Sequence, residues 1–353
     1  MGKMLKRVIS LVVLSAMALT LMAGLTGCEG DTRTKLYVYN WGEYIDEEIL
    51  DLFEKEYPEY KVVYDTFATN EEMYQKVVSS GVSYDVLIPS DYMIERMIKE
   101  NRLLEIDTSK LENYGKINPS LLGKEFDPEE KYSVPYMWGT LGIVYNKKLV
   151  TEPVNSWSIL WDKKYDGQIL MLESVRDTIG FTLKMLGYSL NTTSEAEVNE
   201  ARDKLLEAKD LYADWGVDTV KDPMKNGSYA MTVNWSGDAI DMMSENPDLD
   251  YVVPEEGSNV WLDSMVIPNT SKNPEGALKF IDFMCRTDIA LMNAEEIGYS
   301  TPQTEAMGQL DPELQNSPVY NPSQEVLDKC EVFVDLGDAL SYYNAAWEKI
   351  RLS

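Results

Sequence analysis

The stretch that decides the fold reads LYVYNWGEYIDEEILDLFEKEYPEYKVVYDTFATNEEMYQKVVSSGVSYDVLIPSDYMIERMIK over residues 36–99. Its apolar residues form short, strand-like runs that alternate with segments of helical period. The strands are predicted at 36–40, 60–67 and 84–89, and the helices at 46–57, from the Thr69-x-x-Glu72 capping box, and at 92–99. A βαβαβα order of this kind predicts an α/β fold, with a parallel sheet covered by helices.

The rest of the chain continues in the same style. We predict strands at 142–146, 168–172 and 230–234, and helices at 175–186, 194–209, after Asp238 and from Asn273-Pro274. At 353 residues, two α/β lobes are the natural arrangement. No Pro- or Gly-rich linker separates them, so the chain is expected to cross on ordered segments, with a ligand cleft between the lobes.

Composition excludes several functions. The chain has no histidine, which removes Ser-His-Asp and Cys-His catalysis and histidine-ligated zinc. Its formal net charge of -28 would repel nucleic acid and anionic lipid headgroups. Tyr 22 and Trp 8 outnumber Phe 7, so most aromatic rings carry a polar group. These features favour a receptor for a cationic molecule, and we expect no cofactor.

Residues 1–27 have the pattern of a targeting segment. Lys3, Lys6 and Arg7 precede an apolar run from Val8 to Leu25, and Leu-Thr-Gly leads to Cys28. The run approaches membrane-spanning length, which is the alternative interpretation. Leu-Thr-Gly-Cys looks like a bacterial lipobox, in which cleavage leaves a cysteine that carries lipid. We therefore predict a signal peptide at 1–27 and a protein held outside the cytoplasm through Cys28.

The roles of two other pairs of residues are each open to two interpretations. Cys285 and Cys330 could form a disulfide in an oxidising compartment, but a buried thiol at helical spacing also explains Cys285. Tyr342 and Tyr343 could suggest a tyrosinate iron site, although neighbours in a terminal helix are typical packing residues.

The turn after the first strand carries Trp41, Glu43 and Tyr44. Ligands of open α/β sheets bind beyond the carboxyl ends of the strands, so these side chains could form half of a cation cage. An ordinary turn with a packed tryptophan is the alternative. Ser90 and Tyr92 follow the third strand in the same way, and Ser90 is also a suitable N-cap for the next helix.

Other candidates lie further along the chain. Trp261 and Asp263 point to the same side of an alternating strand, so a ring and a carboxylate are presented together. Trp235 follows a strand, and Tyr299 lies in IGYSTP. Glu173 and Asp177 flank a helix start, where acids commonly serve as partners of the helix dipole.

Read together, these segments resemble the spermidine/putrescine-binding proteins of bacterial ABC importers, a family of type II periplasmic binding proteins. The resemblance runs from about Leu36 to Tyr343. It is carried by segments in the family's order: NWGEY (40–44), YDVLIPSDYMI (84–94), FDPEEKYSVPYMWGT (126–140), GYSLNTT (187–193), WLDSMVIP (261–268), NPEGAL (273–278) and EEIGYSTP (295–302).

The resemblance implies a two-lobed fold whose acidic, aromatic cleft binds a polyamine and presents it to the importer's permease. It places the cage aromatics at Trp41, Tyr44, Tyr92, Trp235, Trp261 and Tyr299, the acids at Glu43, Asp177 and Asp263, and a hydroxyl contact at Ser90. Two positions depart from the pattern. Ser174 replaces a second acid, for which Glu173 could substitute, and Phe333 replaces an amide side chain.

The organisation implied is a lipid-anchored linker at 28–34, lobe 1 at 35–139 plus 262–307, and lobe 2 at 140–261 plus 308–353. We expect a monomer that is open when empty and closed on its ligand, because three carboxylates shut in a dry cleft would repel one another. A receptor for a quaternary amine is one alternative. A secreted hydrolase using a carboxylate pair such as Asp177 and Asp263 is another.

Overall fold

The computed structural model describes residues 31–352 except residue 80. The predicted signal peptide and the predicted lipid attachment at Cys28 lie outside the described residues. The strands are β1 (Thr34–Trp41), β2 (Tyr60–Phe67), β3 (Val86–Leu87), β4 (Ser133–Asn146), β5 (Ile169–Leu172), β6 (Tyr212–Gly216), β7 (Met231–Trp235), β8 (Leu249–Val252) and β9 (Val260–Val266).

The longer helices are α2 (Glu48–Glu56), α3 (Asn70–Ser79), α4 (Asp91–Lys99), α5 (Val175–Met185), α6 (Glu195–Ala208), α8 (Ser236–Glu245), α9 (Pro274–Met284), α10 (Thr287–Ile297) and α14 (Leu340–Leu352). Short helices α7 (Lys221–Lys225), α11 (Thr304–Met307), α12 (Pro312–Gln315) and α13 (Gln324–Leu327) lie between them. The predicted strands and helices are confirmed with ends that differ by a few residues, except that the strand predicted at 142–146 begins nine residues earlier, at Ser133.

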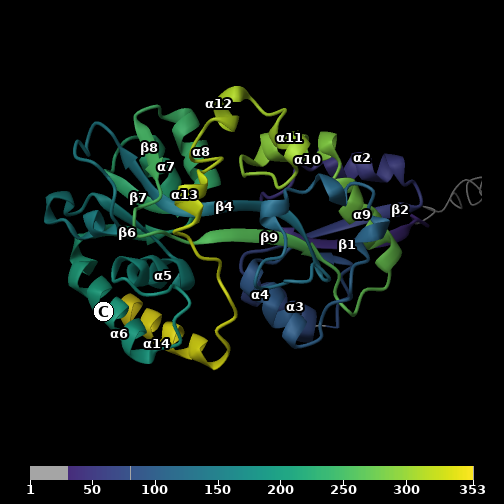
Figure 1. The fold of residues 1–353 in the computed structure, drawn as a ribbon, viewed down its shortest axis with the longest axis horizontal. Helices are drawn as coiled ribbons and strands as arrows, with labels where there is room; N and C mark the ends of the chain where they lie inside the picture. Colours follow the sequence, from purple (N-terminus) through teal and green to yellow (C-terminus); the bar gives the residue numbers. More distant parts are fainter. Residues whose placement is uncertain (1–30, 80, 353) are drawn as a thin grey trace, which may run out of the picture.

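The strands form two parallel sets joined by two long shared strands. The order is β2-β1-β3-β9-β4-β7-β5-β6, with β8 also paired to β4. β1 pairs in parallel with β2 and β3, and β5 pairs in parallel with β6 and β7. β9 and β4 are antiparallel to each other and to their outer neighbours β3 and β7. Figure 1 shows β4 and β9 running from one body of the molecule into the other.

The first body is built on β1, β2 and β3, whose residues alternate between two cores. Leu36 and Val38 of β1 pack in a cluster with α2, α9 and α10. Tyr39, which points to the other face, packs in a second cluster with α3 and α4. A helix layer therefore covers each face of the parallel set, as the βαβαβα order predicts (Figure 1).

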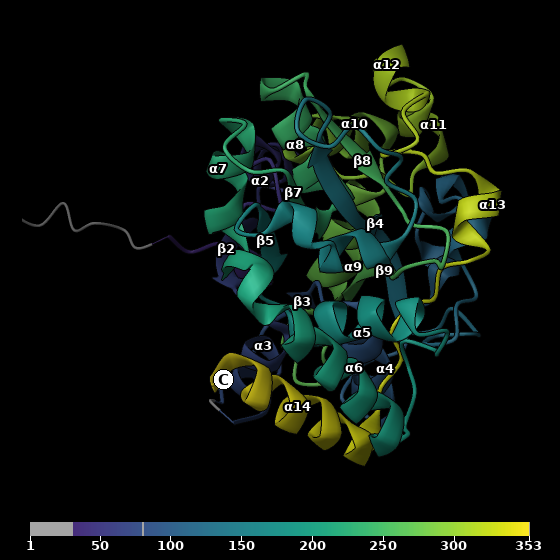
Figure 2. The ribbon, with the colours of Figure 1, turned by 90° about the vertical axis from the view of Figure 1, so that its left-hand side faces the viewer.

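The second body repeats this arrangement on β5, β6 and β7. Ile169 and Met171 of β5 pack with α5, α6 and α14, whereas Leu170 packs on the opposite face with α7 and α8. Figure 2 looks onto this body and shows α14 crossing beside α5 and α6. Leu310 and Tyr320 belong to the core of the first body. The chain thus remains in contact with the first body beyond residue 307, where we had expected it to return to the second.

Helix starts show how closely local sequence governs the fold. Thr69 Oγ1 accepts the Glu72 backbone N–H at 3.1 Å, and Glu72 reaches back to the N–H of Ala68 at 3.0 Å. Asn273 Oδ1 likewise caps α9 by accepting from Gly276 N–H at 3.1 Å. Ser90 occupies the N-cap position of α4, but its side chain does not cap the helix. Its hydroxyl is thus available for other contacts.

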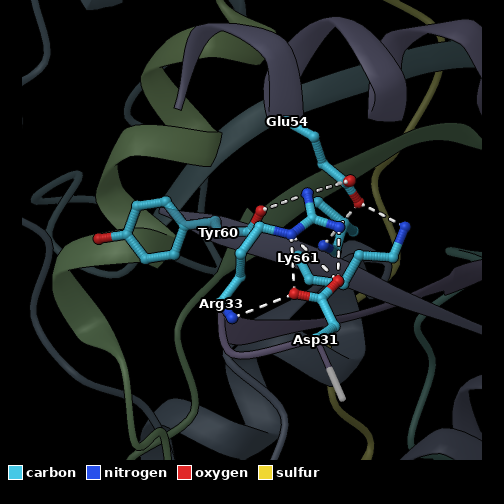
Figure 3. A network of polar contacts seen from close by, with 6 residues as sticks. Asp31, Arg33, Glu54, Tyr60 and Lys61 are labelled. Atoms are coloured by element: carbon cyan, nitrogen blue, oxygen red, sulfur yellow. Dashed lines mark hydrogen bonds and ion pairs between the residues drawn. The ribbon is translucent and has the colours of Figure 1, made fainter. Parts of the chain in front are cut away.

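A polar network fastens the beginning of the described chain to the first body (Figure 3). The Arg33 guanidinium contacts Asp31 at 2.6 Å and Glu54 at 2.7 Å, and donates to the Tyr60 carbonyl at 3.2 Å. Lys61 adds a second ion pair with Glu54 at 2.9 Å. β1 then begins at Thr34, one residue before the predicted start of lobe 1. The last residues of the predicted linker are therefore part of the folded body.

Two choices left by the sequence are settled. Cys285 and Cys330 are both free thiols, so they form no disulfide. Tyr343 is fully buried and donates to the Thr192 carbonyl at 2.9 Å, which supports packing rather than iron binding. No group of three His, Cys, Asp or Glu residues within 31–352, residue 80 apart, could hold a metal ion. Over the same residues, no helix is both long and apolar enough to cross a membrane.

Candidate functional site

Asp263 is the carboxylate around which the site is organised. β9 places it beside the loop after β1, and its Oδ2 accepts the Tyr44 hydroxyl at 3.0 Å. Its Oδ1 is buried without a partner among the described residues. Burial raises the pKa of Asp263 to about 6, an effect that the Ser90 and Tyr44 hydroxyls partly counter. A buried carboxylate with a free oxygen is suited to receive a cationic donor.

Aromatic rings surround this carboxylate. Tyr299 packs edge-on against Tyr44 with ring centroids 5.5 Å apart, and against Trp261 at 5.3 Å. Trp261 is buried, and its indole N–H has no partner among the described residues. Trp41 is the last residue of β1, just before the turn that carries Tyr44. Its ring packs on Phe67 with ring centroids 4.6 Å apart. The structure thus brings together the rings predicted after β1, on β9 and in the 295–302 segment.

Two glycines allow the rings to approach the backbone closely. A Cβ added at Gly139 of β4 would meet the Trp261 ring at 2.6 Å, and one at Gly237 would meet the Tyr299 ring at 2.3 Å. Both distances are shorter than Cβ atoms tolerate. Gly237 lies in the first turn of α8 in the second body, whereas Tyr299 follows α10 in the first. The Tyr299–Gly237 contact therefore spans the two bodies.

Asp177 forms the second acidic centre, at the start of α5. Its Oδ2 accepts the Ser174 hydroxyl at 2.6 Å, and its Oδ1 lies 3.5 Å from Asn259 Nδ2. Burial raises the pKa of Asp177, while the Ser174, Asn259 and Trp235 side chains oppose that rise. Ser174 also caps α5 through the Asp177 backbone N–H. Ser174 thus positions Asp177, in place of the second acid that the family pattern would supply.

Ser90, which is bridged to Asp263 through the backbone, and Tyr92 meet around Asn70. The Asn70 amide donates to Ser90 Oγ and to the Tyr92 hydroxyl, both at 3.1 Å. Tyr92 in turn donates to Glu71 at 3.1 Å, and its ring lies edge-on to Phe333 at 6.4 Å. Phe333 is buried and arrives from the C-terminal segment of the chain. Asn70 was not predicted, because an asparagine at a helix start is read as a cap.

Arg176 is the other residue that sequence reasoning missed. It is a buried guanidinium 4.3 Å from the centre of the Phe333 ring, 5.6 Å from Tyr92 and 5.4 Å from Tyr343. It donates to the Val334 carbonyl at 3.2 Å and to Asn191 Oδ1 at 3.0 Å. It precedes the candidate Asp177 in the first turn of α5, where no sequence pattern marks an arginine as part of a site.

Two predicted acids lie outside this buried set. Glu173 is exposed and forms an ion pair with Arg351 at 3.0 Å, so it does not take the place of the acid missing at Ser174. Glu43 is also exposed, and its backbone is left-handed with φ of 51°. Non-glycine residues seldom adopt that conformation, which orients the turn between Trp41 and Tyr44.

The cleft is closed in this structure. Asp335 of the C-terminal segment pairs with Lys99 of α4 at 3.3 Å, and its backbone N–H donates to Glu95 at 2.7 Å. Asp177 and Asp263 are each at most 7% exposed, and Trp235 packs against the cores of both bodies. Trp41, Ser90, Tyr92, Trp235 and Tyr299 are partly buried at its edges. The candidate site is therefore a set of buried acids and aromatic rings where the two bodies meet.

Similarity to known proteins shows the family of this chain. The sequence profile of bacterial extracellular solute-binding proteins matches residues 48–321. The chain belongs to this family. It is 37% identical to the spermidine/putrescine-binding periplasmic protein of Escherichia coli K12 over 341 residues, covering 96% of this chain and 97% of that protein.

Solved structures agree with this assignment. A spermidine/putrescine ABC transporter substrate-binding protein from Streptococcus pneumoniae is 40% identical, with a TM-score of 0.81 over 90% of this chain and 99% of its own. A lipoprotein of Treponema pallidum is 28% identical, with a TM-score of 0.82 over 91% of this chain and 100% of its own. The fold is thus that of type II periplasmic solute-binding proteins.

Membership of the solute-binding family corrects one alternative. A hydrolase using Asp177 and Asp263 is wrong, because members of this family are receptors that bind and release a solute without chemical change. The two carboxylates remain candidates for ligand binding. Their buried positions agree with that role, because a hydrolytic pair also needs room for an attacking water.

Proposed function

We propose that this solute-binding protein is the polyamine receptor of an ABC importer, taking spermidine or putrescine into the cleft. The observation that carries the proposal is Asp263, a buried carboxylate with a free oxygen beneath the rings of Tyr44, Trp261 and Tyr299. The names of its relatives support the same ligand class.

A polyamine suits such a cleft because it alternates ammonium groups with methylene runs. Each ammonium can bind a carboxylate, and the rings supply an apolar wall together with a negative face. A well-placed cation–π contact contributes roughly 0.5–2 kcal/mol. A hydrogen bond to a charged group adds about 1.5–3 kcal/mol. Asp177 and Asp263 come from different bodies, so they converge on one ligand only when the cleft is closed.

The cellular setting follows from the same proposal. The lipobox-like Leu25-Thr26-Gly27-Cys28 would leave a lipid on Cys28, outside the cytoplasm, and a relative that is itself a lipoprotein supports this. The chain would then work as a lipid-anchored monomer that delivers its ligand to the permease. The Arg33 network would bring the anchored segment onto the body at the edge formed by β2 (Figure 3).

The experiment is calorimetric titration of the desalted protein with putrescine, spermidine, glycine betaine and a neutral oligosaccharide. Binding of one of the two polyamines, with at least a hundredfold weaker binding of the other two compounds, supports the proposal. The aromatic cage alone would also accept a quaternary amine, which cannot donate a hydrogen bond to Asp263. Tighter binding of betaine than of either polyamine would therefore replace this proposal with a quaternary-amine receptor.

A further inference from the structure

We infer that Asp238, held in place by Lys221, is a positioning residue that fixes the Tyr299 ring when the cleft closes. The inference rests on the proposed function and concerns the same site. Asp238 lies in the first turn of α8 in the second body, whereas Tyr299 follows α10 in the first. Contact between these two side chains therefore joins one body to the other.

The backbone brings the two residues together. Gly298 ends α10 with a left-handed φ of 71°, and a Cβ added there would lie 3.9 Å from the Gly237 carbonyl oxygen. A Cβ added at Gly237 would meet the Tyr299 ring at 2.3 Å, so the ring lies directly against the backbone that precedes Asp238. The Tyr320 hydroxyl donates to the Tyr299 carbonyl at 2.7 Å. The first body thus holds the backbone of Tyr299, while its ring meets the second.

The Asp238 carboxylate interacts with the Tyr299 hydroxyl across this junction. Burial raises the pKa of Tyr299 well above its usual range, and Asp238 adds to that rise. The hydroxyl therefore keeps its proton and can act as a donor. A charged acceptor forms a stronger hydrogen bond than a neutral one, so the effect of Asp238 depends on its remaining ionised.

Lys221 supports the ionised form of Asp238. Its Nζ lies 2.8 Å from Asp238 Oδ1 and 2.9 Å from Asp218 Oδ1. The Asp238 side chain is only 13% exposed, so solvent screens its ion pair weakly, whereas the Asp218 side chain is 84% exposed. Burial raises the pKa of Asp238, and Lys221 opposes that rise. Lys221 thus fixes both the place and the charge of the acceptor.

The consequence for binding lies in the tilt of one ring. Tyr299 packs edge-on against Tyr44 and Trp261, with ring centroids 5.5 and 5.3 Å apart. The tilt of its ring decides whether its negative face meets an ammonium group of the ligand. Because Asp238 and Tyr299 belong to different bodies, opening the cleft separates them and frees the ring. An acid in the first turn of a helix also interacts with the helix dipole, but that interaction does not depend on Tyr299.

The test is a double-mutant cycle measured by calorimetry at pH 7.5 with putrescine and spermidine. For the polyamine that the natural protein binds more tightly, Asp238→Ala and Tyr299→Phe should each weaken binding at least fivefold. Tyr299→Phe keeps the ring and removes only the hydroxyl. In the Tyr299→Phe background, Asp238→Ala should weaken binding by no more than a further twofold, because the contact is already lost.

Asp241→Ala is the matched control, because Asp241 lies one turn further along α8 and also pairs with a lysine, Lys225, at 2.8 Å, but is 52% exposed. It should change the affinity less than twofold. An equal loss from Asp238→Ala in both backgrounds would assign Asp238 to the helix dipole or to general attraction of cations, and would overturn the inference. Natural affinity in Tyr299→Phe overturns it as well, even if Asp238→Ala does not fold. In both cases polyamine binding itself stands, whereas a natural protein that binds neither polyamine refutes the proposed function and the inference with it.

Discussion

At the scale of single residues, Asp263 links ligand binding to pH. Its pKa of about 6 lies above the ordinary aspartate value of 3.8 because the side chain is buried. Between these values the folded protein holds a proton that the unfolded chain has released. The contribution of Asp263 to the stability of the closed, free protein is therefore greatest at low pH and decreases as the pH rises through 6. A bound cation reverses this preference, because it favours the charged carboxylate.

We therefore predict that polyamine affinity falls as the pH is lowered through 6, by up to about tenfold per pH unit. Tyr44, Ser90 and Asp91 also face this carboxylate, and burial raises the pKa of Asp91 too. Calorimetry between pH 5 and 8 measures the effect. Asp263→Asn should bind weakly at every pH and lose most of the dependence. An equally steep profile in that variant would assign the titration to another group.

Trp261 supplies the ring that packs on Gly139 and Tyr299. We predict that Trp261→Ala weakens polyamine binding by more than tenfold, because the ligand loses an aromatic wall beside Asp263. Circular dichroism should still show a folded protein, with a lower Tm because a buried ring is lost. Trp215→Ala is the control, since that ring packs on Trp347 at 5.7 Å outside the cleft. Equal affinities of Trp261→Ala and the natural protein would remove Trp261 from the site.

At the scale of elements, α8 meets the first body through Gly237. We predict that Gly237→Ala prevents full closure, because its Cβ would lie 2.3 Å from the Tyr299 ring, and that affinity falls at least tenfold. Calorimetry gives the affinity, and thermal unfolding of the free protein checks the fold. Gly308→Ala is the matched control, because a Cβ there meets its nearest neighbours at an ordinary 3.6 Å. Similar affinity losses in both variants would contradict a role specific to closure.

The same scale shows what could be predicted from the sequence. The alternation of strands and helices over 36–99 was predictable, because β1 and β2 have strand-like apolar runs and α3 has its capping box. β4 was recognised only over its last five residues. Pro135, Gly139 and a continuous buried pattern hide its first nine, which gain their strand conformation from pairing with β9.

The residues of the candidate site likewise fall into those that the sequence indicated and those that only the fold reveals. Trp41, Tyr44 and Asp263 follow strand ends or alternate on a strand, so local rules and the family resemblance both indicated them. Glu173 was misplaced because neighbouring residues at a helix start point in different directions, and only the fold shows its pairing with Arg351. Arg176 could not be recognised, because its partners come from α4, the C-terminal segment and α14.

At the scale of the whole molecule, the closed cleft implies an open counterpart through which ligand enters. We predict that adding the bound polyamine to the desalted protein decreases its radius of gyration in small-angle X-ray scattering. The ligand supplies positive charge that offsets repulsion among the buried carboxylates. Gly237→Ala should show a smaller decrease than the natural protein. A radius that does not change on saturation would mean that the free protein is already closed.

The strands β4 and β9 have a consequence for how the protein melts. β9 pairs with β3 of the first body, β4 pairs with β7 and β8 of the second, and the two strands pair with each other, so one continuous sheet runs through both bodies. Two independent domains joined by a linker would melt in separate steps. Here loss of either body leaves unpaired strand edges in the survivor. Differential scanning calorimetry should therefore record one cooperative transition for residues 31–352, and two resolved peaks would show that each body keeps its structure alone.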